Sequence, residues 1–201
     1  MAITINRENE LQEQLDSFFK NRFGINGFYE KLTCADFVGL KKILSCINNV
    51  ITLLATKAFV HRLYADGRIS QKDKATIWDD VNGLHANTNG YDVRYDFPGK
   101  KPVDGIIAEV KCNIPVNGNS FGAAQIEGIE EDVEHLLHGK KKGMVEVGNY
   151  YKFMVILAAN EHIQECVEKV FRGNPNVQEY SSTSKLSVQN VYVVYVSIDK
   201  A

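Results

Sequence analysis

The chain of 201 residues lacks most of the patterns by which common protein classes are recognised. Its four cysteines (Cys34, Cys46, Cys112 and Cys166) are widely spaced and match neither a zinc-binding pattern nor a disulfide framework. It has no uninterrupted apolar run of about 18 residues, and the polar, acidic residues 1–14 are unlike a signal peptide. These absences predict a cytoplasmic protein with reduced thiols and no membrane association.

Several catalytic patterns are also missing from the sequence. It contains no glycine-rich phosphate loop, no serine-nucleophile elbow, no internal repeat and no low-complexity tract. The formal net charge of −2 argues mildly against broad affinity for nucleic acid, because Lys and Arg side chains that neutralise phosphates dominate such binding. A hydrophobic content of 44% allows one well-packed domain, or one domain with a helical lobe.

The two ends of the chain differ in their apolar periodicity. Residues 8–64 show helical spacing, with breaks predicted at 24–27 and at 32–33, and a turn at 66–70 precedes a helix capped by Ser70. Beyond residue 90, short β-prone runs alternate with amphipathic segments. We therefore expect a helical N-terminal part at residues 1–69 and an α/β core at residues 70–201.

Residues 90–113 predict a β-hairpin with charged residues in an unusual place. The second arm, residues 103–112, is apolar enough for an interior strand and yet contains Glu109 and Lys111. These two side chains are two residues apart and therefore project from the same face. Burying them without partners would be costly, so the pair is a candidate functional site.

The first arm of the hairpin contributes further carboxylates. A four-residue turn at 98–101 places Asp92 and Asp96 on the same face as Glu109 and Lys111. In this register Asp92 is a diagonal neighbour of Glu109, whereas Asp96 lies nearer the turn and is a possible accessory residue. Two carboxylates on neighbouring strands suit Mg²⁺, which takes one or two carboxylates and keeps several waters. A lysine beside them can orient a water or stabilise charge in phosphodiester hydrolysis.

The arrangement Asp92, then Glu109-x-Lys111 on the next strand, resembles the signature of the PD-(D/E)XK nuclease superfamily, whose fold is called restriction-endonuclease-like. The resemblance implies that Asp92 and Glu109 bind the metal ion, Mg²⁺ or alternatively Mn²⁺, and that Lys111 is the catalytic lysine. Tyr91 stands where the family usually has proline. The family core runs helix, three strands, helix, strand, and only two strands are evident here before the next helix.

The segments after the hairpin fit a core of alternating helices and strands. Residues 121–138 have helical periodicity, and Ser120 is a plausible N-cap. Gln125 lies in the first turns of that helix, where it is either a solvated residue or, as in several branches of the superfamily, a residue near the site. The expected later elements are strands at 151–159 and 191–198, a helix at 161–171, and a loop at 173–189.

These observations lead to an expected fold and function. We expect an α/β fold with a mixed central sheet flanked by helices and, by resemblance, a Mg²⁺-dependent, site-specific DNA endonuclease similar to a type II restriction enzyme and acting as a homodimer. The helical N-terminal part at residues 1–69 would then supply dimerisation or DNA contacts. Lys140, Lys141 and Lys142 are candidate phosphate contacts or a solvated helix end. The alternatives are another nuclease of this fold, acting in DNA repair or on branched DNA or RNA, and an inactive nucleic-acid-binding or interaction module.

Overall fold

A computed structural model describes residues 7–83, 90–99, 102–115, 120–140 and 146–198. The chain forms two compact units, Met1–Ile47 and Asn48–Ala201. The division falls inside one helix, α2 (Cys34–Ala65), and not at 69/70 as the periodicity had predicted. The boundary differs because Phe59 and Leu63 of α2 belong to the core cluster on one face of the sheet in the second unit.

The first unit is helical, as predicted. It contains α1 (Arg7–Phe23), the short helix η1 (Tyr29–Lys31) and the first part of α2. Thr33 and Asp36 form a reciprocal cap that begins α2, since the Asp36 carboxylate accepts hydrogen bonds from the Thr33 amide (2.8 Å) and hydroxyl (2.6 Å). None of the described residues between 8 and 47 has a buried side chain.

Helix α2 bears on the expected absence of a membrane span. It has 32 residues and is long and apolar enough to cross a membrane by length and composition alone. The core helix of a soluble protein can be equally long and apolar. In α2 the five residues Ala55, Thr56, Phe59, Val60 and Leu63 are buried. The C-terminal half of the helix is therefore part of a protein core.

The second unit contains a five-stranded sheet. Its strands are β1 (Val93–Asp96), β2 (Gly105–Lys111), β3 (Tyr150–Leu157), β4 (Val177–Glu179) and β5 (Val191–Val196). They are arranged in the order β1-β2-β3-β5-β4, in which β1 is antiparallel to β2 and the other neighbours are parallel. Parallel neighbours need crossover connections, and α4 (Ala123–His138) and α5 (Ile163–Phe171) lie in them, with the short helix η2 (Val147–Asn149) before β3.

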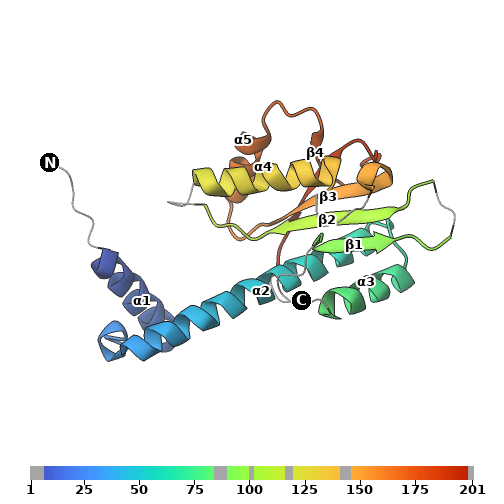
Figure 1. Ribbon diagram of the computed structural model, residues 1–201. Helices are drawn as coiled ribbons and strands as arrows, with labels where there is room; N and C mark the ends of the chain where they lie inside the picture. Colours follow the sequence, from blue (N-terminus) through green and yellow to red (C-terminus); the bar gives the residue numbers. More distant parts are fainter. Residues whose placement is uncertain (1–6, 84–89, 100–101, 116–119, 141–145, 199–201) are drawn as a thin grey trace. The chain divides into compact units, whose positions relative to one another are not determined.

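Helices cover both faces of the sheet (Figure 1). The C-terminal half of α2 and α3 (Gln71–Gly83) pack on one face, and α4 and α5 pack on the other. Both faces of β3 and β5 are consequently apolar: in β5, Val191 and Val193 point toward α4 and α5, while Tyr192 and Val194 point toward α2 and α3. The molecule is thus a mixed α/β protein, as predicted.

Most expected elements are confirmed within a few residues. The helix capped by Ser70 is α3, where the Ser70 amide and hydroxyl both donate to Asp73. The predicted strands and helices after residue 120 correspond to α4, β3, α5 and β5. The prediction of a loop throughout 173–189 was wrong, because β4 adds a three-residue strand at the edge of the sheet. Within the described ranges no strand precedes β1.

Candidate functional site

Asp92, Glu109 and Lys111 lie on the face of the sheet that α4 covers. The β1–β2 register ends at Val93 and Ala108, and just beyond it the Asp92 carboxylate accepts a hydrogen bond from the Val110 amide, which brings Asp92 close to Glu109. Lys111 ends β2 and projects from the same face as Glu109, since the two are two residues apart. Its ammonium lies 2.7 Å from a carboxylate of α4. The structure therefore brings the three predicted residues together.

The hairpin differs from the prediction by two residues of register. The strands are joined by residues 97–104, of which 100 and 101 lie outside the described residues, and the Phe97 amide donates to the Asp104 carbonyl at 2.7 Å. The four-residue turn was therefore wrong: Asp96 pairs with Gly105, where Val103 was expected. A shift of two residues leaves every side chain on the same face of the sheet. The predicted site residues therefore still share one face.

Gly105 explains why this register is the one adopted. A Cβ atom at this position would lie 2.0 Å from the carbonyl oxygen of Tyr95 on the neighbouring strand. Only glycine allows the two backbones to approach so closely, and the partner of Gly105 is Asp96. The packing between Gly105 and β1 therefore holds Asp92 close to Glu109, four residues farther along β2.

Glu109 is buried, with only 5% of its surface exposed. Burial raises the pKa of its carboxyl to about 8, a change that the Lys140 ammonium opposes and the Asp92 carboxylate reinforces. Burial also raises the pKa of Asp92, although the Val110 amide donates to its carboxylate at 2.7 Å and lowers the pKa. Both acids are thus held where their charged forms are disfavoured, and an additional cation would stabilise them.

Lys140, which follows the last turn of α4, completes the surroundings of Glu109. Its ammonium lies 2.5 Å from Oε1 of Glu109 and 5.0 Å from the ring centroid of Tyr91, and it donates a hydrogen bond to the Gly90 carbonyl. The contact is an ion pair between the ammonium and a carboxylate oxygen that is itself buried. Of the three lysines predicted as phosphate contacts, Lys140 instead approaches the acid pair; Lys141 and Lys142 lie outside the described residues.

Lys111 forms an ion pair with α4. Its ammonium lies 2.7 Å from Oδ2 of Asp132, and both side chains are about four-fifths buried. The other carboxylate oxygen of Asp132 lies 3.8 Å from Nδ1 of His135, one turn along the helix. Asp132 also raises the pKa of Glu109 and of Asp92, so it belongs to the same electrostatic cluster. The catalytic lysine of the prediction is therefore held in place by a carboxylate.

The two accessory candidates lie elsewhere. Gln125 caps α4: its side-chain oxygen accepts from the Gly122 amide (2.9 Å) and its nitrogen donates to the Ile114 carbonyl (2.9 Å). The N-cap is Gly122, two residues after the predicted Ser120. Asp96 is exposed at the far end of β1, about 13 Å from Asp92 by strand rise, and accepts hydrogen bonds from Arg94 and Tyr150.

Sequence reasoning missed Asp132 and the place of Lys140. A signal for Asp132 was present, because it lies three residues after Ile129 and four before Leu136, both buried residues of α4. An acid on the apolar stripe of a helix needs a partner, and the lysine on the facing strand was a candidate. No comparable signal identified Lys140, whose approach to Glu109 depends on where α4 ends.

The residues of this cluster fit a divalent cation held by two protein carboxylates. Asp92 and Glu109 are the two, and Oε1 of Glu109 would exchange the Lys140 ammonium, 2.5 Å away, for the metal ion. Among the described residues no group of three or more His, Cys, Asp or Glu side chains is arranged to hold a metal ion. A site with two carboxylates suits Mg²⁺, which retains waters in its remaining positions, better than Zn²⁺ or Ca²⁺.

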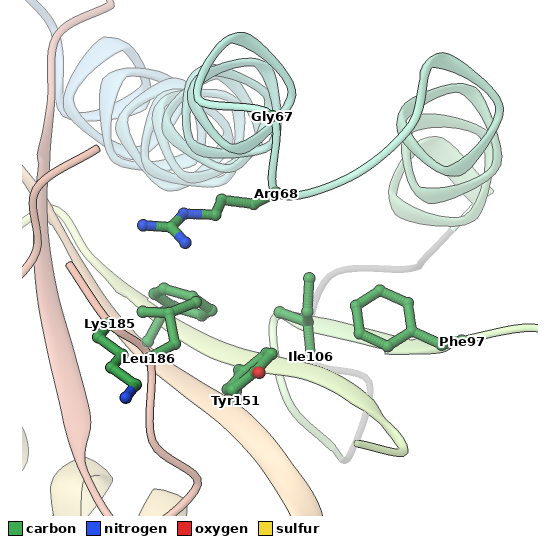
Figure 2. A pocket seen from close by; sticks show the side chains of 8 residues that line it. Gly67, Arg68, Phe97, Ile106, Tyr151, Lys185 and Leu186 are labelled. Atoms are coloured by element: carbon green, nitrogen blue, oxygen red, sulfur yellow. The ribbon is translucent and has the colours of Figure 1, made fainter. Parts of the chain in front are cut away.

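The other face of the sheet carries a separate cavity of about 450 Å³ (Figure 2). Arg68 lies on one side of it, and Ile106, Tyr151 and Phe97 lie on the side of the sheet. Two carbonyl oxygens, of Ser182 and Ser184, accept hydrogen bonds from Arg68. Neither acid of the cluster lines this cavity, so it is distinct from the candidate site.

Comparisons of the chain with models of protein families, with curated proteins and with solved structures gave no match.

Proposed function

We propose that the protein is a Mg²⁺-dependent endonuclease that hydrolyses phosphodiester bonds in DNA and has a restriction-endonuclease-like fold. The observation that carries this proposal is the acid pair of buried Glu109 on β2 and partly buried Asp92 just before β1, with Lys111 on the same face as Glu109. An ordinary surface Glu–Lys pair would lie in water, whereas Glu109 is 5% exposed and has a pKa raised to about 8. Such a perturbed acid in a cluster of charges is a feature of functional sites.

The order of elements around the pair supports the same proposal. After β2 come α4 and the parallel strand β3, in agreement with the helix and strand that follow the Glu-x-Lys signature in the superfamily that the sequence resembles. Asp92 precedes β1 and Lys111 ends β2, so the antiparallel pairing gathers the three residues at one end of the hairpin. No strand among the described residues corresponds to the first of the family's three.

Each residue has a role in this proposal. Asp92 and Glu109 would hold a Mg²⁺ or Mn²⁺ ion, which supplies Lewis-acid polarisation of the phosphate and a water of lowered pKa. Lys111 would orient the attacking water or stabilise the negative charge that develops on the phosphate oxygens. Asp132 would hold the ammonium of Lys111 in place, at the 2.7 Å separation seen here.

A second candidate is an inactive nucleic-acid-binding or interaction module on the same fold. It is favoured by one observation: both lysines of the cluster are already paired with carboxylates, Lys111 with Asp132 and Lys140 with Glu109. In that case the cluster would be an ion-pair network, no divalent cation would bind to it, and substitutions of the acid pair would leave nucleic-acid or partner binding unchanged.

Cleavage of mixed plasmid and phage DNA by the purified protein tests the proposal. The reactions contain Mg²⁺ or EDTA, and wild type is compared with Asp92→Ala, Glu109→Ala and Lys111→Ala. We expect Mg²⁺-dependent fragments from wild type and a loss of roughly 100- to 1,000-fold or more in each variant. Mg²⁺ titration by calorimetry should show lost binding in Asp92→Ala and Glu109→Ala and retained binding in Lys111→Ala. Discrete fragments would further establish site specificity.

Glu130→Gln is a matched control, because Glu130 is an exposed acid of α4. It should cleave and bind Mg²⁺ like wild type. Equal Mg²⁺-dependent cleavage by wild type and all three site variants would refute the assignment of the residues. No cleavage together with no binding of Mg²⁺ or Mn²⁺ would favour the inactive module, and cleavage confined to RNA or branched DNA would identify another nuclease.

A further inference from the structure

The cavity on the α2 and α3 face of the sheet combines an aromatic floor with two cationic side chains (Figure 2). Its floor is the cross-strand pair of Ile106 and Tyr151, with Phe153 two residues along β3 on the same face. Phe97, from the connection between β1 and β2, lines the cavity as well. None of these side chains carries a charge, and the aromatic rings offer flat surfaces that a planar ligand can contact.

Arg68 is fixed at the wall of this cavity by the way α2 ends. Gly67 has a φ of +68°, a left-handed conformation that favours glycine, and the Arg68 amide donates to the Leu63 carbonyl at 2.8 Å, which closes the helix. The guanidinium then donates to the carbonyls of Ser182 (2.8 Å) and Ser184 (2.6 Å). A cation held at both its backbone and its side chain loses little conformational freedom when an anion binds to it.

The positive charge at this wall is not matched by a carboxylate among the described residues. The oxygens bonded to the Arg68 guanidinium are carbonyl and hydroxyl oxygens without charge, and the nearby Asp66 pairs with Arg62 at 3.8 Å. Lys185, an exposed residue, adds a second cation to the lining. In the part of the chain that the structure describes, neither Arg68 nor Lys185 forms an ion pair. Two such cations favour a ligand with a dianionic group.

The loop that carries Lys185 is itself anchored to the core. The hydroxyl of Tyr192, a buried residue of β5, donates to the Lys185 carbonyl (3.2 Å) and accepts from the amide two residues later (2.8 Å). Leu186 lies between these contacts and lines the cavity. Arg68 and Lys185 lie toward the end formed by this loop, and Phe97 lies toward the end formed by the hairpin (Figure 2). The cavity therefore has a charged end and an aromatic end.

We propose that this cavity binds a 5′-nucleotide, with the base against Tyr151 and Phe97 and the phosphate held by Arg68 and Lys185. Every base has a π-face that stacks on aromatic side chains, and a phosphate monoester carries about two negative charges at neutral pH. The volume of about 450 Å³ lies in the range of roughly 300 to 1,000 Å³ that is typical of small-molecule sites. An apolar carboxylate would match only one of the two cations. Two sources present this chemistry: a free mononucleotide and the 5′-phosphorylated end of a DNA strand.

Calorimetric titration of the full chain in EDTA with deoxyadenosine 5′-monophosphate tests this site. Wild type is compared with Lys185→Glu, which reverses the charge of one cation, and with Tyr151→Leu, which removes an aromatic ring. Lys169→Glu is the matched control, because Lys169 is an exposed lysine of α5, on the other face of the sheet. We expect wild type and the control to bind alike, and the dissociation constant to rise roughly 10-fold or more in each site variant. Deoxyadenosine and inorganic phosphate, which each supply half of the ligand, should also bind at least about 10-fold more weakly.

Methyl NMR locates the ligand without any substitution. The methyl signals of Ile106 and Leu186 should shift on titration, whereas those of Ile129, buried in α4 on the other face of the sheet, should not. A 5′-phosphorylated oligodeoxyadenylate distinguishes the two sources. Tighter binding of the oligonucleotide than of the mononucleotide, with the same losses in the variants, assigns the site to the end of a strand, and the reverse order assigns it to a free nucleotide.

Four outcomes would overturn the inference. Wild type binds neither probe at millimolar concentration, or deoxyadenosine or inorganic phosphate binds as tightly as the nucleotide. Lys185→Glu binds as tightly as wild type, or the NMR shifts appear at Ile129 and not at Ile106. If Tyr151→Leu fails to fold, Lys185→Glu and the NMR titration decide. The inference does not rest on the proposed nuclease activity, because EDTA removes divalent metal and neither substituted residue belongs to the acid cluster.

Discussion

Glu109→Gln should make the metal-free protein more stable while abolishing the proposed activity. Two effects oppose each other in this substitution. Removing the charge takes an ion-pair partner from Lys140, but it also removes the need to bury a carboxylate. The pKa of Glu109 decides between them: it is raised to about 8 even with Lys140 only 2.5 Å away, so ionisation of Glu109 disfavours the folded state.

The size of the effect depends on pH. With a pKa of about 8 in the folded state and 4.5 in the unfolded state, the folded protein holds its proton more tightly, so stability is lost as pH rises through this interval. This pKa difference lowers the free energy of unfolding by about 1 kcal/mol at pH 5, about 3 kcal/mol at pH 7 and about 4 kcal/mol at pH 8. Glutamine avoids this cost, and its advantage over wild type should increase in the same order.

Urea unfolding followed by circular dichroism in EDTA at pH 5, 7 and 8 measures the difference. Glu130→Gln, an exposed acid on α4, should change stability by no more than about 0.5 kcal/mol at any of these pH values. The reasoning is refuted if Glu109→Gln is no more stable than wild type at pH 7, or if its advantage is the same at pH 5 and pH 8. Glu109 would then be a structural partner of Lys140. Adding Mg²⁺ should stabilise wild type and leave Glu109→Gln unchanged.

Three further predictions follow from the geometry. Asp132→Asn should lower the cleavage rate roughly 10- to 100-fold with little change in KM, because the ammonium of Lys111 loses the carboxylate that holds it. If the substitution merely disturbs the helix, steady-state kinetics will show a change in KM as well as in the rate. Gly105→Ala should destabilise the protein by more than about 2 kcal/mol in urea, since its Cβ would lie 2.0 Å from a carbonyl oxygen; a smaller loss would mean that the strands can separate freely. Lys152 is 2% exposed and burial lowers its pKa to about 8, so the loss of its proton should add about 1 kcal/mol of stability between pH 7 and pH 9, which in wild type offsets the loss caused by Glu109. The gain should therefore be visible in Glu109→Gln and absent from Glu109→Gln/Lys152→Met.

The hairpin illustrates what sequence can predict. Alternation along residues 105–111 is a local property, so the shared face of Glu109 and Lys111 followed from it directly. The register between β1 and β2 depends on the length of the connection between them, and local turn preferences predicted a connection that was too short. The decisive residue was Gly105, whose close contact with Tyr95 is visible only when both strands are placed. The prediction of the site survived because the error was an even number of residues.

The contribution of α4 shows the opposite limit. Helical periodicity identified the helix and its buried face, but the rotation of that face over β2 is set by packing with Ile107 and other residues of the sheet. Asp132 meets Lys111 only because of that rotation, and Lys140 meets Glu109 only because α4 ends beside Tyr91. Gln125 had the right location in sequence for a site residue, yet capping the helix occupies both ends of its side-chain amide. The partners of Lys111, Glu109 and Gln125 thus depend on contacts between segments that are distant in sequence, which helical periodicity does not predict.

The formal charges of the cluster bear on why such a costly arrangement is kept. Asp92, Glu109 and Asp132 bring three negative charges to the space under α4, and Lys111 and Lys140 bring two positive ones. A network that served stability alone could be replaced by apolar side chains with little loss. A divalent cation together with the single negative charge of a phosphodiester would instead bring the whole cluster to neutrality. Because Lys111 is paired with Asp132 and Lys140 with Glu109, the negative charge that no lysine matches is that of Asp92, and it lies close to Glu109, where the proposed chemistry requires the metal ion.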